Sequence, residues 1–138
     1  MEVALVGGAA KRGIFIKQVF KESPVLDRLA FSSNSKYAAS VHYHNGGRRM
    51  MLFGAPEILL NFTNLSDEEK SEIIKEIDER AFSGERVLGA ISKEPCPDYQ
   101  SLNGHNFSGF NFDGLVTFQD PLRKGVFESM SRIADAGV

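Results

Sequence analysis

Residues 37–53 contain the pattern that most limits how this chain can fold. From residue 37 to residue 44 two sets of side chains alternate, one of them being Tyr37, Ala39, Val41 and Tyr43. A period of two places one set on the buried face of a β-sheet. Asn45-Gly46-Gly47 follows, and these residues tolerate the positive φ angles of a tight turn. The run from Arg48 to Phe53 then returns antiparallel, so the sequence predicts a β-hairpin.

Further strands are expected on both sides of this hairpin. Apolar and β-branched residues bounded by Gly, Pro and Ser indicate strands over 13–20, 25–31 and 86–92, and a last strand or pair of strands within 107–119. The stretch 95–104 contains Pro, Asn and Gly and is expected to be a loop.

Helical spacing predicts the remaining elements. A short helix is expected over 2–12, a second over 56–62 with Pro56 in its first turn, and a third after the capping box formed by Ser66 and Glu69. A final helix after Asp120 carries one apolar side: Val126, Phe127, Met130, Ile133 and Ala134. Hairpins and helices in clusters predict an α+β fold, a mainly antiparallel β-sheet flanked by helices.

Composition excludes several partners. A formal net charge of −2 gives the chain no basic field for nucleic acid or anionic lipid, and no apolar stretch approaches the length of about 20 residues that a bilayer span needs. Nucleic acid and direct membrane contact are therefore not expected. The single cysteine, Cys96, fits a reducing compartment, with an inert buried thiol favoured over a reactive one.

Five short segments occur in the order found in one family of proteins. They are Glu-Val-Ala-Leu at 2–5, Phe-Ser-Ser-Asn-Ser-Lys at 31–36, Gly-Ala-Pro-Glu at 54–57, Arg-Val-Leu at 86–88 and Asp-Pro-Leu-Arg at 120–123. Together they resemble the nucleotide-binding (N) domain of a cation-transporting P-type ATPase. Residues 1–119 would be that domain, and 120–138 the start of the return into a phosphorylation domain. Both ends of the chain are interpreted as cuts through a longer protein.

The resemblance implies a division of labour between domains. In that family the N domain holds ATP while an aspartate elsewhere is phosphorylated, and Mg²⁺ acts in the intact enzyme. The phosphorylated Asp-Lys-Thr-Gly-Thr segment and the Thr-Gly-Asp segment do not occur here. The chain is therefore expected to be a cytosolic domain with no catalytic residue of its own and no bound Mg²⁺. Its expected partners are ATP and the phosphorylation, actuator and transmembrane domains of the same parent chain.

The resemblance also assigns nucleotide-binding roles to six residues, Glu2, Phe31, Lys36, Gly54, Arg86 and Leu88. Phe31 would stack on the adenine, Glu2 would accept from its amino group, and Leu88 would pack on its other side. Lys36 and Arg86 would meet the phosphates. Gly54 would let backbone approach the ligand.

Each of these residues also has a plain structural alternative. Phe31 and Leu88 would be core residues, and Gly54 would serve only a strand-to-helix turn. Lys36 would be an ordinary surface lysine, Arg86 would pair with Glu85 or another acid, and Glu2 would interact with a helix dipole.

One position departs from the family's pattern. Members usually carry lysine immediately before Gly-Ala-Pro-Glu, where this chain has Phe53. The substitution removes a cation, and it favours a second hypothesis: a degenerate module with little nucleotide binding and a structural or regulatory interaction role. A free-standing hydrolase is disfavoured, because no nucleophile, base and orienting group can be assembled. His42, His44 and His105 do not specify a metal site and are interpreted as solvated histidines.

Overall fold

Five antiparallel strands form the sheet in the computed structural model, which describes residues 2–97 and 99–119. The strands are β1 (Val25–Leu29), β2 (Tyr37–His44), β3 (Gly47–Gly54), β4 (Arg86–Lys93) and β5 (Asn111–Phe118). They lie side by side in sequence order, and every neighbouring pair is antiparallel. With the helices around it, this sheet confirms the predicted α+β fold.

Strands β2 and β3 pair antiparallel as the predicted hairpin. Tyr37 pairs with Gly54 at one end, and His44 pairs with Gly47 at the other. Asn45 and Gly46 form the turn with φ angles of 47° and 80°. Asparagine and glycine adopt this left-handed conformation at low cost, which is why the chain reverses here.

Helices precede the sheet and separate β3 from β4. They are α1 (Glu2–Lys11), α2 (Ile16–Glu22), α3 (Pro56–Leu59), the 3-10 helix η1 (Leu60–Phe62) and α4 (Asp67–Phe82). At the start of α4 the Glu69 N–H donates to Ser66 Oγ at 3.2 Å, and the Ser66 N–H donates to the Glu69 carboxylate at 2.8 Å. This reciprocal pair is the predicted capping box, and it fixes where the helix begins.

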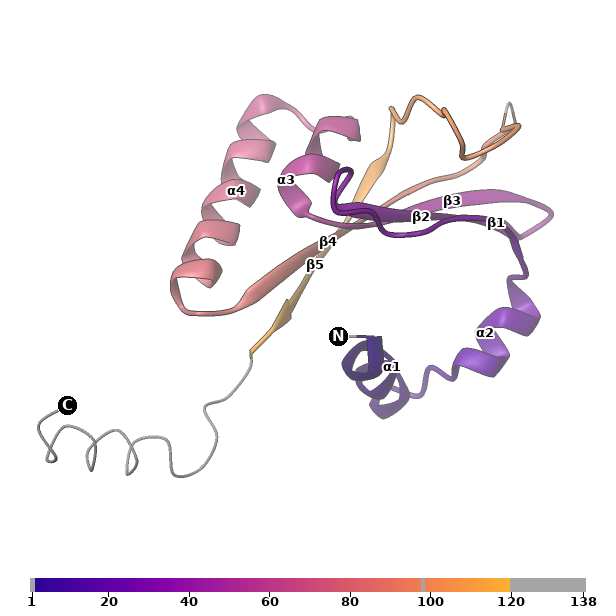
Figure 1. Cartoon of the computed structure of the whole chain (residues 1–138), viewed down its shortest axis with the longest axis horizontal. Coiled ribbons are helices and arrows are strands. Elements are labelled where there is room, and N and C mark those ends of the chain that lie inside the picture. Colours follow the sequence, from indigo (N-terminus) through magenta and orange to yellow (C-terminus); the bar gives the residue numbers. More distant parts are fainter. Residues whose placement is uncertain (1, 98, 120–138) are drawn as a thin grey trace, which may run out of the picture.

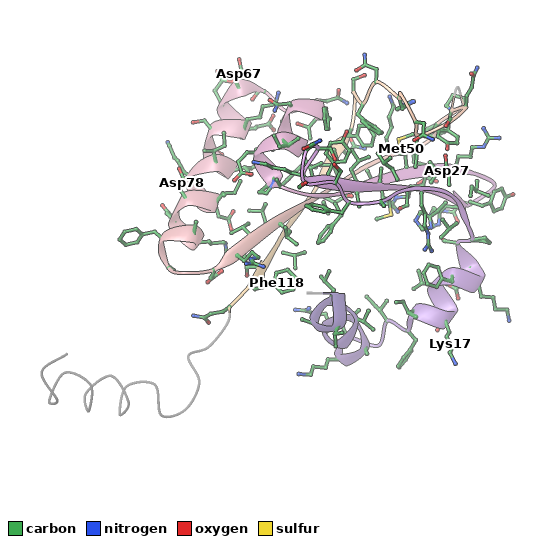
Figure 2. All side chains as sticks on the ribbon, in the orientation of Figure 1. Lys17, Asp27, Met50, Asp67, Asp78 and Phe118 are labelled. Atoms are coloured by element: carbon green, nitrogen blue, oxygen red, sulfur yellow. The ribbon has the colours of Figure 1, made fainter. Side chains whose placement is uncertain are left out.

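The two faces of the sheet have different surroundings (Figure 1). We call the face that carries Val41, Leu52 and Ile91 the core face, because all three side chains are at most 1% exposed. Helix α3 and the segment 94–110 pack over this face, and side chains crowd there around Met50 (Figure 2). Helices α1 and α2 lie on the side of the opposite face, which we call the open face, and α2 has no buried residue.

A polar contact fastens the segment 94–110 to β1. The Tyr99 hydroxyl donates to Asp27 Oδ2, and the Leu102 N–H donates to the same oxygen at 3.2 Å. These hydrogen bonds lower the pKa of Asp27, because they stabilise its charged form. Burial and the hydrogen bond to Asp27 raise the pKa of Tyr99 to about 12. Both shifts favour a neutral phenol that donates to a carboxylate.

The prediction of a strand over 13–20 is wrong, because residues Ile16–Glu22 form α2. Ile16, Val19 and Phe20 also fit the spacing of one helix face, and the Gln18 side chain donates to Glu22 one turn later at 2.8 Å. Periodicity alone cannot separate strand from helix in so short an apolar run.

Other boundaries differ in smaller ways. β1 ends at Leu29, the helix predicted over 56–62 becomes a 3-10 helix from Leu60, and β5 begins only at Asn111. The helix predicted after Asp120 lies outside the described residues.

Candidate functional site

Strand pairing arranges the side chains of the open face in rows. Ala38 pairs with Phe53, and Phe53 pairs with Ala90, so these residues form one row across β2, β3 and β4. In the next row Ser40 pairs with Met51. Residues two apart on a strand point to the same side of a sheet, which places both rows on the open face.

An open pocket of about 750 Å³ lies over these two rows. Phe31, Phe53 and Met51 supply large apolar side chains to its lining. Ala38 and Ala90 flank Phe53 within their row and are too small to fill the space beside its ring. A mainly apolar pocket of this size with a few polar groups is typical of small-molecule sites.

Phe31 follows β1 and is 64% exposed, although a phenylalanine of the core would be buried. The alternative that Phe31 is a core residue therefore does not fit this structure. Phe53 is half-buried and lines the same pocket. The two rings give the pocket surfaces on which a flat ligand can stack.

Lys36 and Gly54 meet where β2 begins and β3 ends. The Ala55 N–H donates to the Lys36 carbonyl at 2.9 Å, and Lys36 is exposed with a φ of 62°. A Cβ atom on Gly54 would come within 2.5 Å of Tyr37 Cα. The close approach of β2 to β3 therefore already requires a glycine, and neither Lys36 nor Gly54 belongs to the pocket lining.

Strand β4 continues the open face away from the pocket. Leu88 and Arg86 lie two and four residues from Ala90, so both point to the pocket's side of the sheet. At a rise of about 3.3 Å per residue, Arg86 lies about 13 Å from Ala90 along the strand. Arg86 is exposed and Leu88 is half-buried. Glu85 pairs with Arg80 at 3.5 Å, not with Arg86.

Glu2 is the first residue of α1, and its side chain lies outside the part of the structure that is described. Of the six residues assigned by resemblance, Phe31 alone lines the pocket within the described ranges. Arg86 and Leu88 share its sheet face, and Lys36 and Gly54 lie together at the end of the hairpin.

Sequence reasoning missed a polar end of the pocket formed by Arg28, Ser40 and His42. Ser40 Oγ lies 2.9 Å from His42 Nε2, while His42 Nδ1 lies 3.3 Å from the Ser23 carbonyl. The Arg28 guanidinium lies 5.6 Å from the centroid of the Phe20 ring. The alternation in 37–44 does place Ser40 and His42 together on one face, but only strand pairing reveals that a pocket lies over it.

Within the described ranges 2–97 and 99–119, no group of three or more His, Cys, Asp or Glu side chains is arranged to hold a metal ion. No helix in the same ranges is long and apolar enough to cross a bilayer. The open face offers a pocket with aromatic rings, a polar end of that pocket, and the Arg86 guanidinium farther along β4.

Comparison with known proteins gives a consistent result along the chain. The family model described as the P-type ATPase cytoplasmic domain N matches residues 1–125. The cation-transporting ATPase pma1 of Synechocystis sp. is 28% identical over 145 residues, which cover 99% of this chain and 16% of that protein. The calcium-transporting ATPase 1 of Lactococcus lactis is 26% identical over 147 residues, or 99% of this chain and 17% of that protein.

A third relative is more similar over a shorter stretch. The sodium/potassium-transporting ATPase subunit alpha-A of Artemia franciscana is 31% identical over 134 residues, or 82% of this chain and 13% of that protein. The chain thus spans between 13% and 17% of the length of these three relatives. Because the family model covers nearly the whole chain, this chain belongs to the P-type ATPase family as a cytoplasmic N domain.

Proposed function

We propose that this domain binds ATP on its open face and presents it to a phosphorylation domain of the same parent chain. The observation that carries the proposal is the pocket itself. It combines the exposed ring of Phe31 with the ring of Phe53. Stacking of a base on an aromatic side chain contributes about 1–3 kcal/mol, and an exposed aromatic ring in a pocket is suited to that contact.

The remaining residues of the face support one orientation of the nucleotide. With the base in the pocket, Arg86 lies along β4 at a distance that ribose and phosphates can span, and its planar guanidinium suits phosphate oxygens. Lys36 adds a mobile charge near the start of β2. Stacking and exposed cations alone predict a dissociation constant of about 1 mM, equivalent to about 4 kcal/mol.

The chemistry of phosphoryl transfer belongs to other domains in this proposal. The open face holds and orients ATP, and none of its residues acts on the transferred phosphoryl group. Mg²⁺ acts in the intact enzyme in this proposal, and no residue of the open face is assigned to it. Residues 1–119 form the binding domain, and 120–138 lead back to the phosphorylation domain. The parent chain is an ion-translocating ATPase of a membrane, and this domain lies in the cytosol.

Phe53 favours a second candidate function. If the missing lysine were essential, the domain would keep its fold but bind little nucleotide, and it would act as a structural or regulatory interaction unit. The position of Phe53 in the pocket disfavours this second function, because its ring adds stacking surface where the family's lysine would place a charge.

Two pocket variants and one control test the proposal. Phe31→Ala is expected to weaken ATP binding by about tenfold, since about 1–3 kcal/mol of stacking is lost. Lys36→Ala is expected to weaken it less, because salt screens an exposed ammonium. Phe82→Ala is the matched control, since Phe82 ends α4, is 96% exposed and does not line the pocket.

Affinities are measured by NMR titration of the ¹⁵N-labelled chain, with folding checked from the dispersion of each spectrum. Equal dissociation constants for the wild type and a folded Phe31→Ala variant would place the base elsewhere. Absence of any saturable shift in the wild type would favour the second candidate function.

A further inference from the structure

We propose that Ser40, oriented by His42, recognises the 6-amino group of the bound purine and so makes the pocket selective for adenine. This inference rests on the proposed function, because it assumes that a purine base occupies the pocket. Both residues belong to the pocket lining, and neither was assigned a role by the sequence. In this proposal Ser40 makes the contact with the amino group that the resemblance assigns to Glu2.

The hydrogen bonds of His42 fix which ring nitrogen carries the hydrogen. Its Nδ1 lies 3.3 Å from the backbone carbonyl of Ser23, and a carbonyl oxygen can only accept. Nδ1 therefore donates, which leaves Nε2 of the neutral imidazole as an acceptor. Nε2 lies 2.9 Å from Ser40 Oγ, so the Ser40 hydroxyl donates its only hydrogen to the ring.

This arrangement turns Ser40 into an acceptor toward the pocket. A serine hydroxyl has one hydrogen and two lone pairs, and the hydrogen is already directed at His42. What Oγ offers a ligand is its lone pairs. The exocyclic amine of adenine is a donor, whereas the corresponding group of guanine is a carbonyl acceptor. An acceptor at Ser40 therefore matches adenine and opposes guanine.

The position of Ser40 suits a contact with the edge of the base. Ser40 lies two residues beyond Ala38 on β2, about 7 Å along the strand from the row that contains Phe53. A ring stacked over Phe31 and Phe53 turns one edge toward the row of Ser40 and Met51. The phosphates then extend in the opposite direction, toward Leu88 and Arg86.

Arg28 is the competing group at this end of the pocket. Its guanidinium can only donate, so it would favour a base with a carbonyl. Arg28 pairs with Ser40 across β1 and β2, but its guanidinium lies 5.6 Å from the Phe20 ring centroid, at a cation–π distance that directs it toward α2. The proposal therefore assigns the edge of the base to Ser40, and the inosine triphosphate comparison tests Arg28.

The test compares ATP with purine riboside 5′-triphosphate, which carries hydrogen in place of the 6-amino group and keeps the same ring nitrogens and phosphates. Both ligands are titrated into the 138-residue chain under the same buffer conditions. The wild type is expected to bind ATP about fivefold more tightly, the effect of one neutral hydrogen bond. Ser40→Ala is expected to weaken ATP binding to the level of the analogue and to leave the analogue unchanged.

A second pair of variants separates orientation from packing. His42→Phe releases the Ser40 hydroxyl, which can then donate to ring nitrogen N1 of either ligand. The ratio of the analogue's dissociation constant to that of ATP should therefore fall toward one. His44→Phe is the control. His44 Nδ1 lies 3.2 Å from Ser23 Oγ, but His44 does not line the pocket, and the fivefold preference should remain.

The failures of the two proposals can be told apart. If neither ligand binds at ten millimolar, the proposed function fails. If both bind with equal dissociation constants, or if Ser40→Ala weakens both equally, the domain still binds nucleotide and the role of Ser40 is overturned. Tighter binding of inosine triphosphate than of ATP would also overturn it, because Arg28 would then recognise the base.

Discussion

Substituting Gly54 by alanine separates a structural role of this glycine from a role in ligand binding. An added Cβ atom would lie 2.5 Å from Tyr37 Cα and 2.7 Å from Tyr37 Cβ. Ordinary contacts between carbon atoms are about 3.5–4.0 Å, so the overlap is about 1 Å. Gly54 pairs with Tyr37 on one side and with Gly89 on the other, so β3 cannot shift there without disturbing both ladders.

The expected cost follows from these contacts. Overpacking costs about 1–3 kcal/mol, and a clash with backbone belongs at the top of that range. For a domain stable by about 5–15 kcal/mol, a loss of about 3 kcal/mol is large. With a urea m-value of about 2 kcal/mol/M, the midpoint of unfolding should fall by about 1.5 M.

Urea denaturation followed by circular dichroism measures this shift. Gly7→Ala is the control, since nothing lies within 4 Å of the added Cβ and alanine is favoured in a helix. Its midpoint should stay unchanged or rise. A Gly54→Ala protein with wild-type stability and weakened ATP binding would refute the reasoning, because Gly54 would then be a ligand contact.

Three further predictions concern the pocket, the polar contact and the C-terminal segment. Phe53→Lys exchanges a ring that can stack on the base for a charge that contributes about 1 kcal/mol in water at about 4 Å, so ATP binding by the variant should show an added salt dependence of up to about fivefold relative to the wild type. A folded variant whose ATP affinity depends on salt no more than that of the wild type would contradict a nucleotide-facing side chain. The pKa of Tyr99 is raised from 10.0 to about 12, so the unfolded chain loses this proton first as the pH rises. Stability should fall between about pH 10 and 12, and Tyr99→Phe should remove that part of the decline in urea midpoints. An equal decline in the wild type and the variant would show that Tyr99 is not its cause. Deletion of residues 120–138 should leave the sheet folded, because β5 ends at Phe118, and should reduce any self-association seen by sedimentation. Loss of spectral dispersion would instead make the deleted segment part of this domain's core.

The sheet was largely predictable because its signals are local. The alternation from Tyr37 and the Asn45-Gly46 turn lie within one stretch of chain, and Ser66 and Glu69 are three residues apart. The strand predicted over 13–20 is wrong because a short apolar run does not separate strand from helix, and Ile16, Val19 and Phe20 also fit the spacing of one helix face.

The site was predictable only where a motif marked it. Phe31 was identified through the segment that follows it, and its exposure agrees with a role outside the core. Ser40 and His42 were missed because their neighbourhood depends on the pairing of β2 with β1 and β3. The hydrogen bond between Asp27 and Tyr99 joins residues 72 apart, so no local pattern could predict it.

The central claim is that the open face binds ATP through the pocket between Phe31 and Phe53. An NMR titration of the assigned, ¹⁵N-labelled wild-type chain with ATP to about ten millimolar, tenfold above the expected dissociation constant, tests it most directly. The account predicts saturable shifts centred on Phe31, Ala38, Phe53 and Ala90, weaker shifts toward Arg86, and none at the exposed end of α4. No saturable shift, or shifts confined to the core-face segment 94–110, would contradict it.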